Sequence, residues 1–152
     1  MRNWLGFIFL FMLGSSCLES AECVKNGDTT LVINFKKLSD GTANTVVLYH
    51  ILAEGSDSVF YESNPAALKQ VPNPVLVSVN PYAEETKFTF VLESEQVTLK
   101  VGYRNDVRLI SEECGTDRVQ VDLAILETQF DSVKVVNSVL TNDRRTNIEI
   151  FN

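Results

Sequence analysis

Apolar and polar residues alternate with a period of two through most of the chain, and this pattern constrains the fold more than any other feature. Leu31, Ile33 and Phe35, for example, fall on one face of an extended segment, as a half-buried strand requires. Turn-forming residues interrupt the pattern about every 8–12 residues, and no segment shows sustained helical periodicity. The sequence therefore predicts an all-β fold, a mainly antiparallel β-sandwich or open barrel of about nine or ten short strands. We expect these strands over residues 29–36, 45–52, 58–62, 75–79, 87–92, 97–103, 107–111, 119–125, 133–140 and 147–151.

Three local signals predict how the strands connect. Residues 39–41 (Ser-Asp-Gly) are typical of a turn and predict a hairpin between the first two strands. Residues 45–52 are apolar on both faces, which predicts one central strand. Residues 105–106 (Asn-Asp) predict a turn that separates two further strands. Parallel pairing needs long crossovers, and the short connections here favour antiparallel sheets.

The N-terminal residues have the layout of a bacterial secretion signal. Arg2 supplies a positive charge, Leu5 to Leu13 are almost all apolar, and small residues follow immediately before Cys17. The ending resembles the lipoprotein box, although Leu13 stands four residues before the cysteine where the usual pattern has three. We therefore expect a signal peptide at 1–16, a lipidated tether at 17–22 with Cys17 as the acylated residue, and a β-sandwich domain at 23–152. Ordinary cleavage near Ala21 is the alternative.

The cysteine count fits this division. The chain has three cysteines, Cys17, Cys23 and Cys114, and an odd number in a secreted protein leaves one to explain. If Cys17 carries lipid, Cys23 and Cys114 remain to form one disulfide in an oxidising compartment. Two free buried thiols are the competing account. No Cys-x-x-Cys spacing occurs and there is a single histidine, so we expect no metal site and no cofactor.

The charge balance limits the partners. Asp and Glu number 20 against 13 Lys and Arg, which gives a net charge of −7. An acidic surface argues against nucleic acid or anionic lipid headgroups as binding partners. We expect contact with the membrane only through the lipid anchor, and a protein of the cell envelope as partner.

Polar residues offer little support for catalysis. His50 lies in an apolar strand, and no nucleophile elbow accompanies it, so a structural or surface role fits it better than acid–base chemistry. Glutamates occur in pairs at 84–85, 112–113 and 93 with 95, but adjacent residues of a strand point to opposite faces, and turns account for the rest. Aspartates concentrate in predicted turns, where their side chains bond local amides, and no loop resembles a calcium-binding EF-hand. We expect no enzyme activity and no catalytic residue.

Three Asp-Ser/Thr-aliphatic triplets are candidate sites of modification. They place Thr29, Ser58 and Ser132 in the acceptor position used for O-glycans in some bacterial envelopes. The simpler interpretation is an aspartate in a turn followed by the β-branched start of a strand. The adjacent Arg144 and Arg145 fit a solvated loop, with an anion or partner contact as the alternative.

Short motifs point to a family. Cys114-Gly115, residues 130–133 (Phe-Asp-Ser-Val) and residues 147–150 (Asn-Ile-Glu-Ile) together resemble a family of small envelope proteins of Gram-negative bacteria that has no assigned function. The resemblance implies paired cysteines and an extracytoplasmic β domain, and it carries over no catalytic residue. We therefore expect a non-enzymatic lipoprotein, anchored in the outer membrane on its periplasmic side, that is an accessory or structural component of an envelope assembly. The alternative is a glycan- or peptide-binding module, and a hydrolase ranks third.

Overall fold

The computed structural model describes residues 23, 27–55, 59–61 and 69–152, and these residues form β-strands joined by turns and loops. The strands are β1 (Thr30–Lys36), β2 (Val46–Leu48), β3 (His50–Ala53), β4 (Val59–Phe60), β5 (Lys69–Val71), β6 (Val75–Ser78), β7 (Glu85–Val91), β8 (Gln96–Ser111), β9 (Gly115–Thr128), β10 (Ser132–Val135) and β11 (Ile148–Phe151). Within the described ranges, no helix has the length and hydrophobicity needed to span a bilayer.

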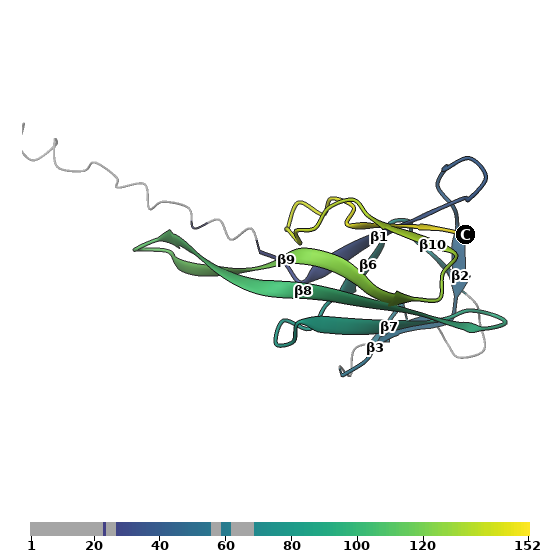
Figure 1. Cartoon of the computed structure of the whole chain (residues 1–152), viewed down its shortest axis with the longest axis horizontal. Helices are drawn as coiled ribbons and strands as arrows, with labels where there is room; N and C mark the ends of the chain where they lie inside the picture. The colour runs from purple at the N-terminus through teal and green to yellow at the C-terminus, as the bar shows by residue number, and fades with distance from the viewer. Residues whose placement is uncertain (1–22, 24–26, 56–58, 62–68) are drawn as a thin grey trace, which may run out of the picture.

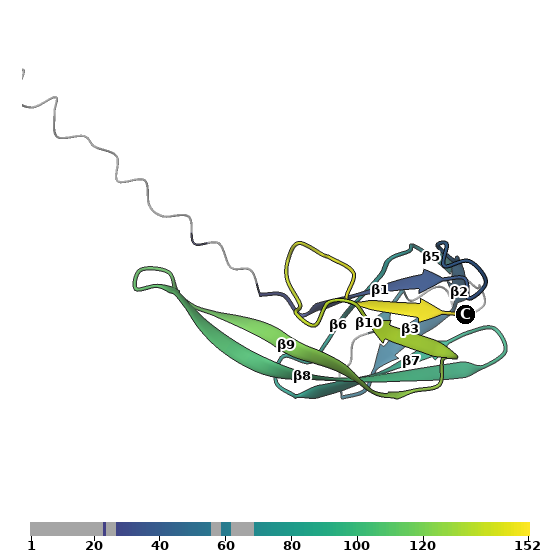
Figure 2. The ribbon, with the colours of Figure 1, turned by 45° about the horizontal axis from the view of Figure 1, so that its top comes forward.

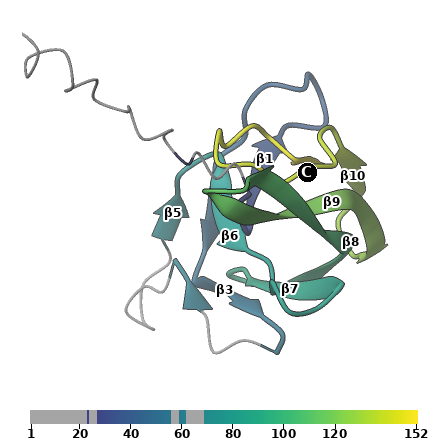
Figure 3. The ribbon, with the colours of Figure 1, turned by 90° about the vertical axis from the view of Figure 1, so that its left-hand side faces the viewer.

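The strands form two larger sheets and one small one. The first has the order β10-β11-β1-β6, the second β4-β3-β7-β8-β9, and β2 pairs with β5 alone. Every strand pairing is antiparallel except that of β1 with β11, which is parallel and joins the two ends of the domain. The view along the long axis shows β1 and β10 on one side and β3 and β7 on the other (Figure 3). This architecture confirms the predicted all-β, mainly antiparallel sandwich.

The core lies between the two larger sheets, because each turns its alternate apolar residues inward. Phe35 of the first sheet meets Phe90 of the second edge to face, with ring centroids 6.1 Å apart, and Phe130 packs against both. Fully buried side chains come from both layers: Leu31, Ile33, Phe35, Ile148 and Ile150 from one, and Ile51, Phe88, Phe90 and Leu99 from the other.

The predicted single strand over 45–52 is wrong, because the chain divides there into β2 and β3, which belong to different sheets. The buried residues change phase at this point: Leu48 is buried at an even position and Ile51 at an odd one. A flat strand cannot turn both toward the same core, so the chain changes direction at Tyr49. The predicted turn at residues 39–41 is present, and Lys36 forms an antiparallel bridge with Ala43 across it. The predicted hairpin does not continue beyond that bridge, since β1 pairs with β6 and β11, and β2 pairs with β5.

The predicted turn at 105–106 is wrong as well, because β8 runs unbroken from Gln96 to Ser111. Asn105 donates to the carbonyl of Ala83 at 2.8 Å and accepts from the Gln120 amide at 2.9 Å. Because the side-chain amide of Asn105 bonds to these neighbouring segments, it is not available to bond to its own local backbone, which is the interaction that would favour a turn. The chain reverses at 112–114, and β9 already begins at Gly115. Both strands are therefore longer than the predicted short segments.

Candidate functional site

The most distinctive part of the molecule is the far half of the β8–β9 hairpin, which we call the hairpin arm: residues 104–121, including the reversal at 112–114. Figures 1 and 2 show that this end of the hairpin extends beyond the rest of the sandwich. The preceding strand β7 pairs with β8 only as far as Glu85 opposite Gly102, and the backbone N–H of Tyr103 then donates to the Glu84 carbonyl. Beyond that point β8 continues to pair with β9, through Ser111 opposite Gly115.

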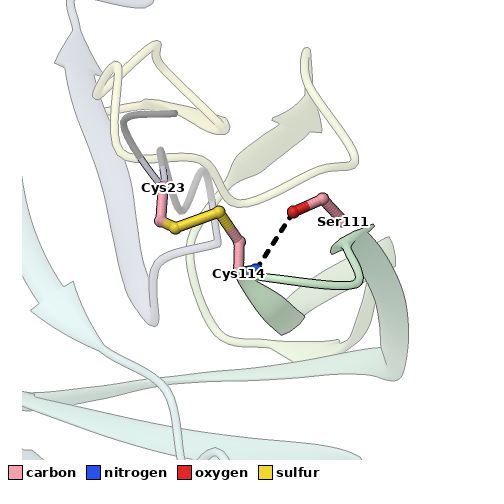
Figure 4. The surroundings of a disulfide bond; sticks show 3 residues. All are labelled: Cys23, Ser111 and Cys114. Carbon is pink, nitrogen blue, oxygen red and sulfur yellow. Dashed lines mark hydrogen bonds between the residues drawn. A yellow bond between two sulfur atoms is a disulfide. The ribbon is translucent and has the colours of Figure 1, made fainter. Parts of the chain in front are cut away.

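A disulfide fixes the end of the arm. Cys23 and Cys114 are bonded, with an S–S distance of 2.01 Å and Cα atoms 5.3 Å apart (Figure 4). The backbone N–H of Cys114 also donates to Ser111 Oγ at 3.0 Å, which closes the reversal between the two strands. The predicted pairing of Cys23 with Cys114 is therefore confirmed.

The chain that enters the domain lies against the second strand of the arm. The backbone N–H of Gly27 donates to an Asp117 carboxylate oxygen at 2.8 Å, and Gly27 forms an isolated bridge with Thr141. A Cβ at Gly27 would lie 1.9 Å from the Arg118 carbonyl oxygen, so only glycine fits this close approach. The disulfide and this contact together join the N-terminal end of the domain to β9.

One face of the arm exposes large apolar side chains. Val107 is 59% exposed and Leu109 is 68% exposed. Arg118, directly opposite Val107, has its guanidinium 5.8 Å from the ring centre of Tyr82, which is itself 88% exposed. We call Tyr82, Val107, Leu109 and Arg118 the arm patch. Aromatic, aliphatic and arginine side chains gathered on one surface are typical of protein–protein interfaces.

The other face of β8 in the arm carries a short row of charges. Arg104 Nε lies 2.9 Å from the Asp122 carboxylate and Arg104 Nη1 lies 3.6 Å from Asp106. Asp106 also pairs with Arg108 at 3.3 Å. These side chains are largely exposed, so each pair contributes little to stability. Their alternation along one strand nevertheless gives this face a defined charge pattern.

A second surface feature is a polar groove on the outer face of the second sheet, with a volume of about 450 Å³. Lys87 and Lys100 lie opposite each other on β7 and β8. Lys87 pairs with Glu54 at 3.3 Å and Lys100 with Glu85 at 2.9 Å, and Glu127 lies opposite Lys100 on β9. The hydrogen bond to Glu85 raises the pKa of Lys100, so this lysine stays charged. Each cation thus has a carboxylate beside it.

A neighbouring hollow of about 400 Å³ shares Gly55 and Thr86 with this groove. Below it, Tyr103 Oη donates to the Asn80 carbonyl at 2.6 Å and lies 2.7 Å from Thr86 Oγ1, which accepts from the Asn80 backbone N–H. Burial raises the pKa of the Tyr103 phenol above its ordinary value. These groups satisfy one another, so the network serves to hold the 80–86 connection against β8.

The structure describes two of the four predicted modification sites, Thr29 and Ser132. Cys17 and Ser58 lie outside the described residues. Thr29 is half-buried at the edge of the second hollow, and its carbonyl accepts from the Val79 N–H. Ser132 is exposed at the start of β10.

The other polar residues weighed in the sequence are dispersed. His50 is half-buried in β3, opposite Val91. Arg145 pairs with Asp143 at 2.7 Å in an exposed loop, and the adjacent Arg144 has a positive φ of 54°. The glutamates at 112–113 and at 93 and 95 are exposed at two hairpin reversals. Within the part of the chain that the structure describes, no three His, Cys, Asp or Glu side chains are placed to hold a metal ion.

Sequence reasoning missed both the arm patch and the groove. The patch was hidden by the predicted turn at 105–106, although the alternation of Val107 and Leu109 continues that of the preceding strand. The sequence signal for the groove is weaker: Lys87 and Lys100 occupy outward-facing positions on two consecutive strands. Its three carboxylates, Glu54, Glu85 and Glu127, come from three different segments, and only the register brings them together.

Comparison with known proteins gives one match. A family model matches residues 45–152, which span β2 to the C-terminus, and its description is Family of unknown function (DUF6452). The motifs at 130–133 and 147–150 and the Cys114-Gly115 pair lie inside the matched range, whereas Cys23 lies before it. No curated protein and no solved structure matches the chain.

Proposed function

We propose that this chain, which belongs to the Family of unknown function (DUF6452), is a non-enzymatic lipoprotein. Cys17 anchors it in the outer membrane on the periplasmic side, where it acts as an accessory or structural component of an envelope assembly. The observation that carries the proposal is the disulfide from Cys23 to Cys114, because it joins the start of the domain to the end of the hairpin arm. A disulfide of this kind fits an oxidising compartment outside the cytoplasm.

The position of the disulfide limits how far the domain stands from the membrane. Six residue steps separate Cys17 from Cys23, and a fully extended chain of that length spans about 20 Å. A lipid on Cys17 would therefore keep the end of the hairpin arm within about 20 Å of the acyl chains. Two or more acyl chains give stable anchoring without electrostatic help from the acidic domain.

The arm patch supports a role in protein contacts rather than in chemistry. Tyr82, Val107 and Leu109 are exposed beside one another, and the arginine beside them is typical of interface hot spots. A membrane-held domain with such a projecting surface is suited to contact neighbouring proteins. We infer that the arm is the part of the molecule that does so.

The lipid anchor is tested by Cys17→Ser in the full chain. We expect the variant to move from the membrane fraction to the soluble fraction, and mass spectrometry of the mature wild-type protein to find acyl mass on an N-terminal Cys17. Ser132→Ala, which changes an exposed hydroxyl far along the chain, is the matched control and should stay in the membrane fraction. An unmodified N-terminus that begins after Ala21 would refute the anchor.

A second candidate function is ligand binding in the groove around Lys87 and Lys100. The observation that favours it is the pair of adjoining hollows, of about 450 and 400 Å³, at the Glu54–Gly55 turn. The alternating charges suit a peptide better than a glycan, since of the four tyrosines, all of them in the described residues, only Tyr82 is exposed. Calorimetric titration with charged peptides tests this function, and Lys100→Ala should abolish any heat of binding. No heat with the wild-type protein would reject the second candidate.

A further inference from the structure

The hairpin arm has an open sheet edge. Strand β8 lies between β7 and β9 as far as Gly102, and from Asp106 to Ile110 its described strand neighbour is β9 alone. A strand with a neighbour on one side presents main-chain N–H and C=O groups that can pair with another strand. Because Val107 and Leu109 also project from this segment, it combines an open edge with exposed apolar side chains.

On β6 and near the end of β1, side chains bond to such main-chain groups. Tyr61 Oη accepts from the backbone N–H of Leu76 on β6 at 2.7 Å. On β1, the Asn73 amide accepts from the N–H of Phe35 at 3.1 Å and donates to its carbonyl at 2.8 Å. Proteins protect edges in such ways against unwanted pairing. Among the residues that the structure describes, none pairs with the main chain of 106–110 on the side away from β9. The segment has a charge pattern there, and that pattern indicates its partner.

We propose that the partner is a second copy of this chain, paired antiparallel with the first along β8 and centred on Val107. In that register Asp106 of each copy lies directly opposite Arg108 of the other, on the same face of the joined sheet, and Val107 lies opposite its own counterpart. Opposite charges that face each other across two strands stabilise the pair. The two hairpins form one continuous sheet in the order β9-β8-β8-β9, and the contact is isologous, as a two-fold axis requires.

The charges select this register over its neighbours. In a two-fold antiparallel pair, the register between the two strands can change only in steps of two residues, because a one-residue shift would place side chains on the wrong face of the sheet. In the register centred on Arg108, the two copies of Arg108 would lie opposite each other. In the register centred on Asp106, the two copies of Asp106 would do so. Like charges directly opposite are destabilising. The register centred on Val107 is the one that turns both charges of each copy into pairs.

The same register covers apolar surface. Leu109 of one copy lies opposite Asn105 of the other, and the Asn105 amide contacts the Ala83 carbonyl next to the exposed Tyr82. Pairing therefore brings the arm patches of the two copies together. This contact is independent of the lipid anchor, so it can fail while the proposed anchoring holds, and the reverse.

Cysteine cross-linking in the full chain tests the register. With Val107→Cys, the two sulfur-bearing residues would face each other with Cα atoms about 4.5–5.5 Å apart, within the range of a disulfide. With Leu109→Cys, the equivalent pair would be four strand positions apart, about 14 Å, which no disulfide spans. After mild oxidation we expect a covalent dimer from Val107→Cys and monomer from Leu109→Cys and from Leu38→Cys, a control at an exposed site on a different loop.

A charge exchange tests the selection of the partner. In the Val107→Cys chain, Arg108→Asp should lower the yield of dimer by about fivefold, the equivalent of about 1 kcal/mol. Adding Asp106→Arg should restore the yield, which a folding defect would not allow. The proposal is overturned if Val107→Cys remains monomeric, if Leu109→Cys cross-links equally well, if the product contains a different polypeptide, or if the second exchange does not restore the dimer.

Discussion

Strand β8 has the same sequence pattern in the two halves of the hairpin and different surroundings, whereas Val119 and Val121 on the β9 side of the arm are buried. In the basal half, Val97, Leu99, Val101 and Tyr103 occupy every second position and are all buried, the last three in the hydrophobic core. In the hairpin arm, Val107 and Leu109 continue the alternation, and both are more than half exposed. Alternation therefore identifies a strand, but the presence of an opposing sheet decides whether its apolar face is core or surface.

The basal half and the hairpin arm are also stabilised by different interactions. Each large apolar side chain buried in the basal half contributes about 1.5–3 kcal/mol. The arm relies instead on its ladder to β9, on the contacts of its second strand, and on the disulfide at its end. Stability should consequently be high and global at the base, and lower and local in the arm.

The largest expected effect comes from removing the covalent bond at the end of the arm. Cys23→Ser with Cys114→Ser opens a loop with a sequence separation of 91 residues. In the chain-entropy model this lowers the free energy of unfolding by about 4.6 kcal/mol. We expect urea unfolding of the detergent-solubilised protein to shift accordingly, and amide hydrogen exchange in residues 104–121 to accelerate more than in β7.

The matched comparison is the same measurement on reduced wild-type protein, which should behave like the double variant. If the arm amides exchange at wild-type rates in the variant, the arm is stabilised by packing, and the contrast between the two halves is wrong.

The next effect concerns the base. Phe90 is fully buried and contacts Phe130 edge to face, with centroids 5.2 Å apart. Phe90→Ala removes that contact and leaves a cavity, which costs about 3–5 kcal/mol. Chemical denaturation measures the loss. A change below about 1 kcal/mol would mean that the core collapses around the cavity, and that the base is less tightly packed than its burial indicates.

The same contrast explains how far the sequence predicts this structure. The strand pattern, the sandwich and the pairing of Cys23 with Cys114 were predictable, because alternation and cysteine count are local or compositional properties. The division at Tyr49 and the unbroken course of β8 through Asn105 were not. Both depend on partners distant in sequence: a change of buried phase between two sheets, and an amide whose hydrogen bonds go to Ala83 and Gln120. The arm patch and the groove share this dependence, since register alone assembles them.

A smaller effect is expected at the junction of the two halves, where Tyr103 ends the buried row. Tyr103→Phe removes a hydroxyl that bonds to the Asn80 carbonyl and to Thr86, and the loss should be about 1–2 kcal/mol. Burial raises the pKa of Tyr103 in the folded protein. Above the ordinary pKa of about 10, the unfolded state therefore loses this proton before the folded state does.

The sign of the pH effect follows from that order. The contribution of Tyr103 is fully present below about pH 10 and is lost as the pH rises through the folded pKa. Urea unfolding of wild type and Tyr103→Phe between about pH 8 and 11 should show the difference between them shrink at the alkaline end. A difference that stays constant would mean that the phenol ionises alike in both states.

The smallest effect is expected in the arm itself. Leu109 is 68% exposed, so Leu109→Ala removes little buried surface and should change the free energy of unfolding by less than about 0.5 kcal/mol. Leu99, ten residues earlier on the same strand and fully buried, provides the control, since Leu99→Ala should cost about 2–5 kcal/mol. If Leu109→Ala costs more than about 1 kcal/mol while Leu38→Ala does not, the Leu109 side chain is covered in solution. A dilution series then identifies what covers it: a loss that disappears on dilution indicates burial by a second copy, as association requires, and a loss that persists on dilution indicates burial within one chain.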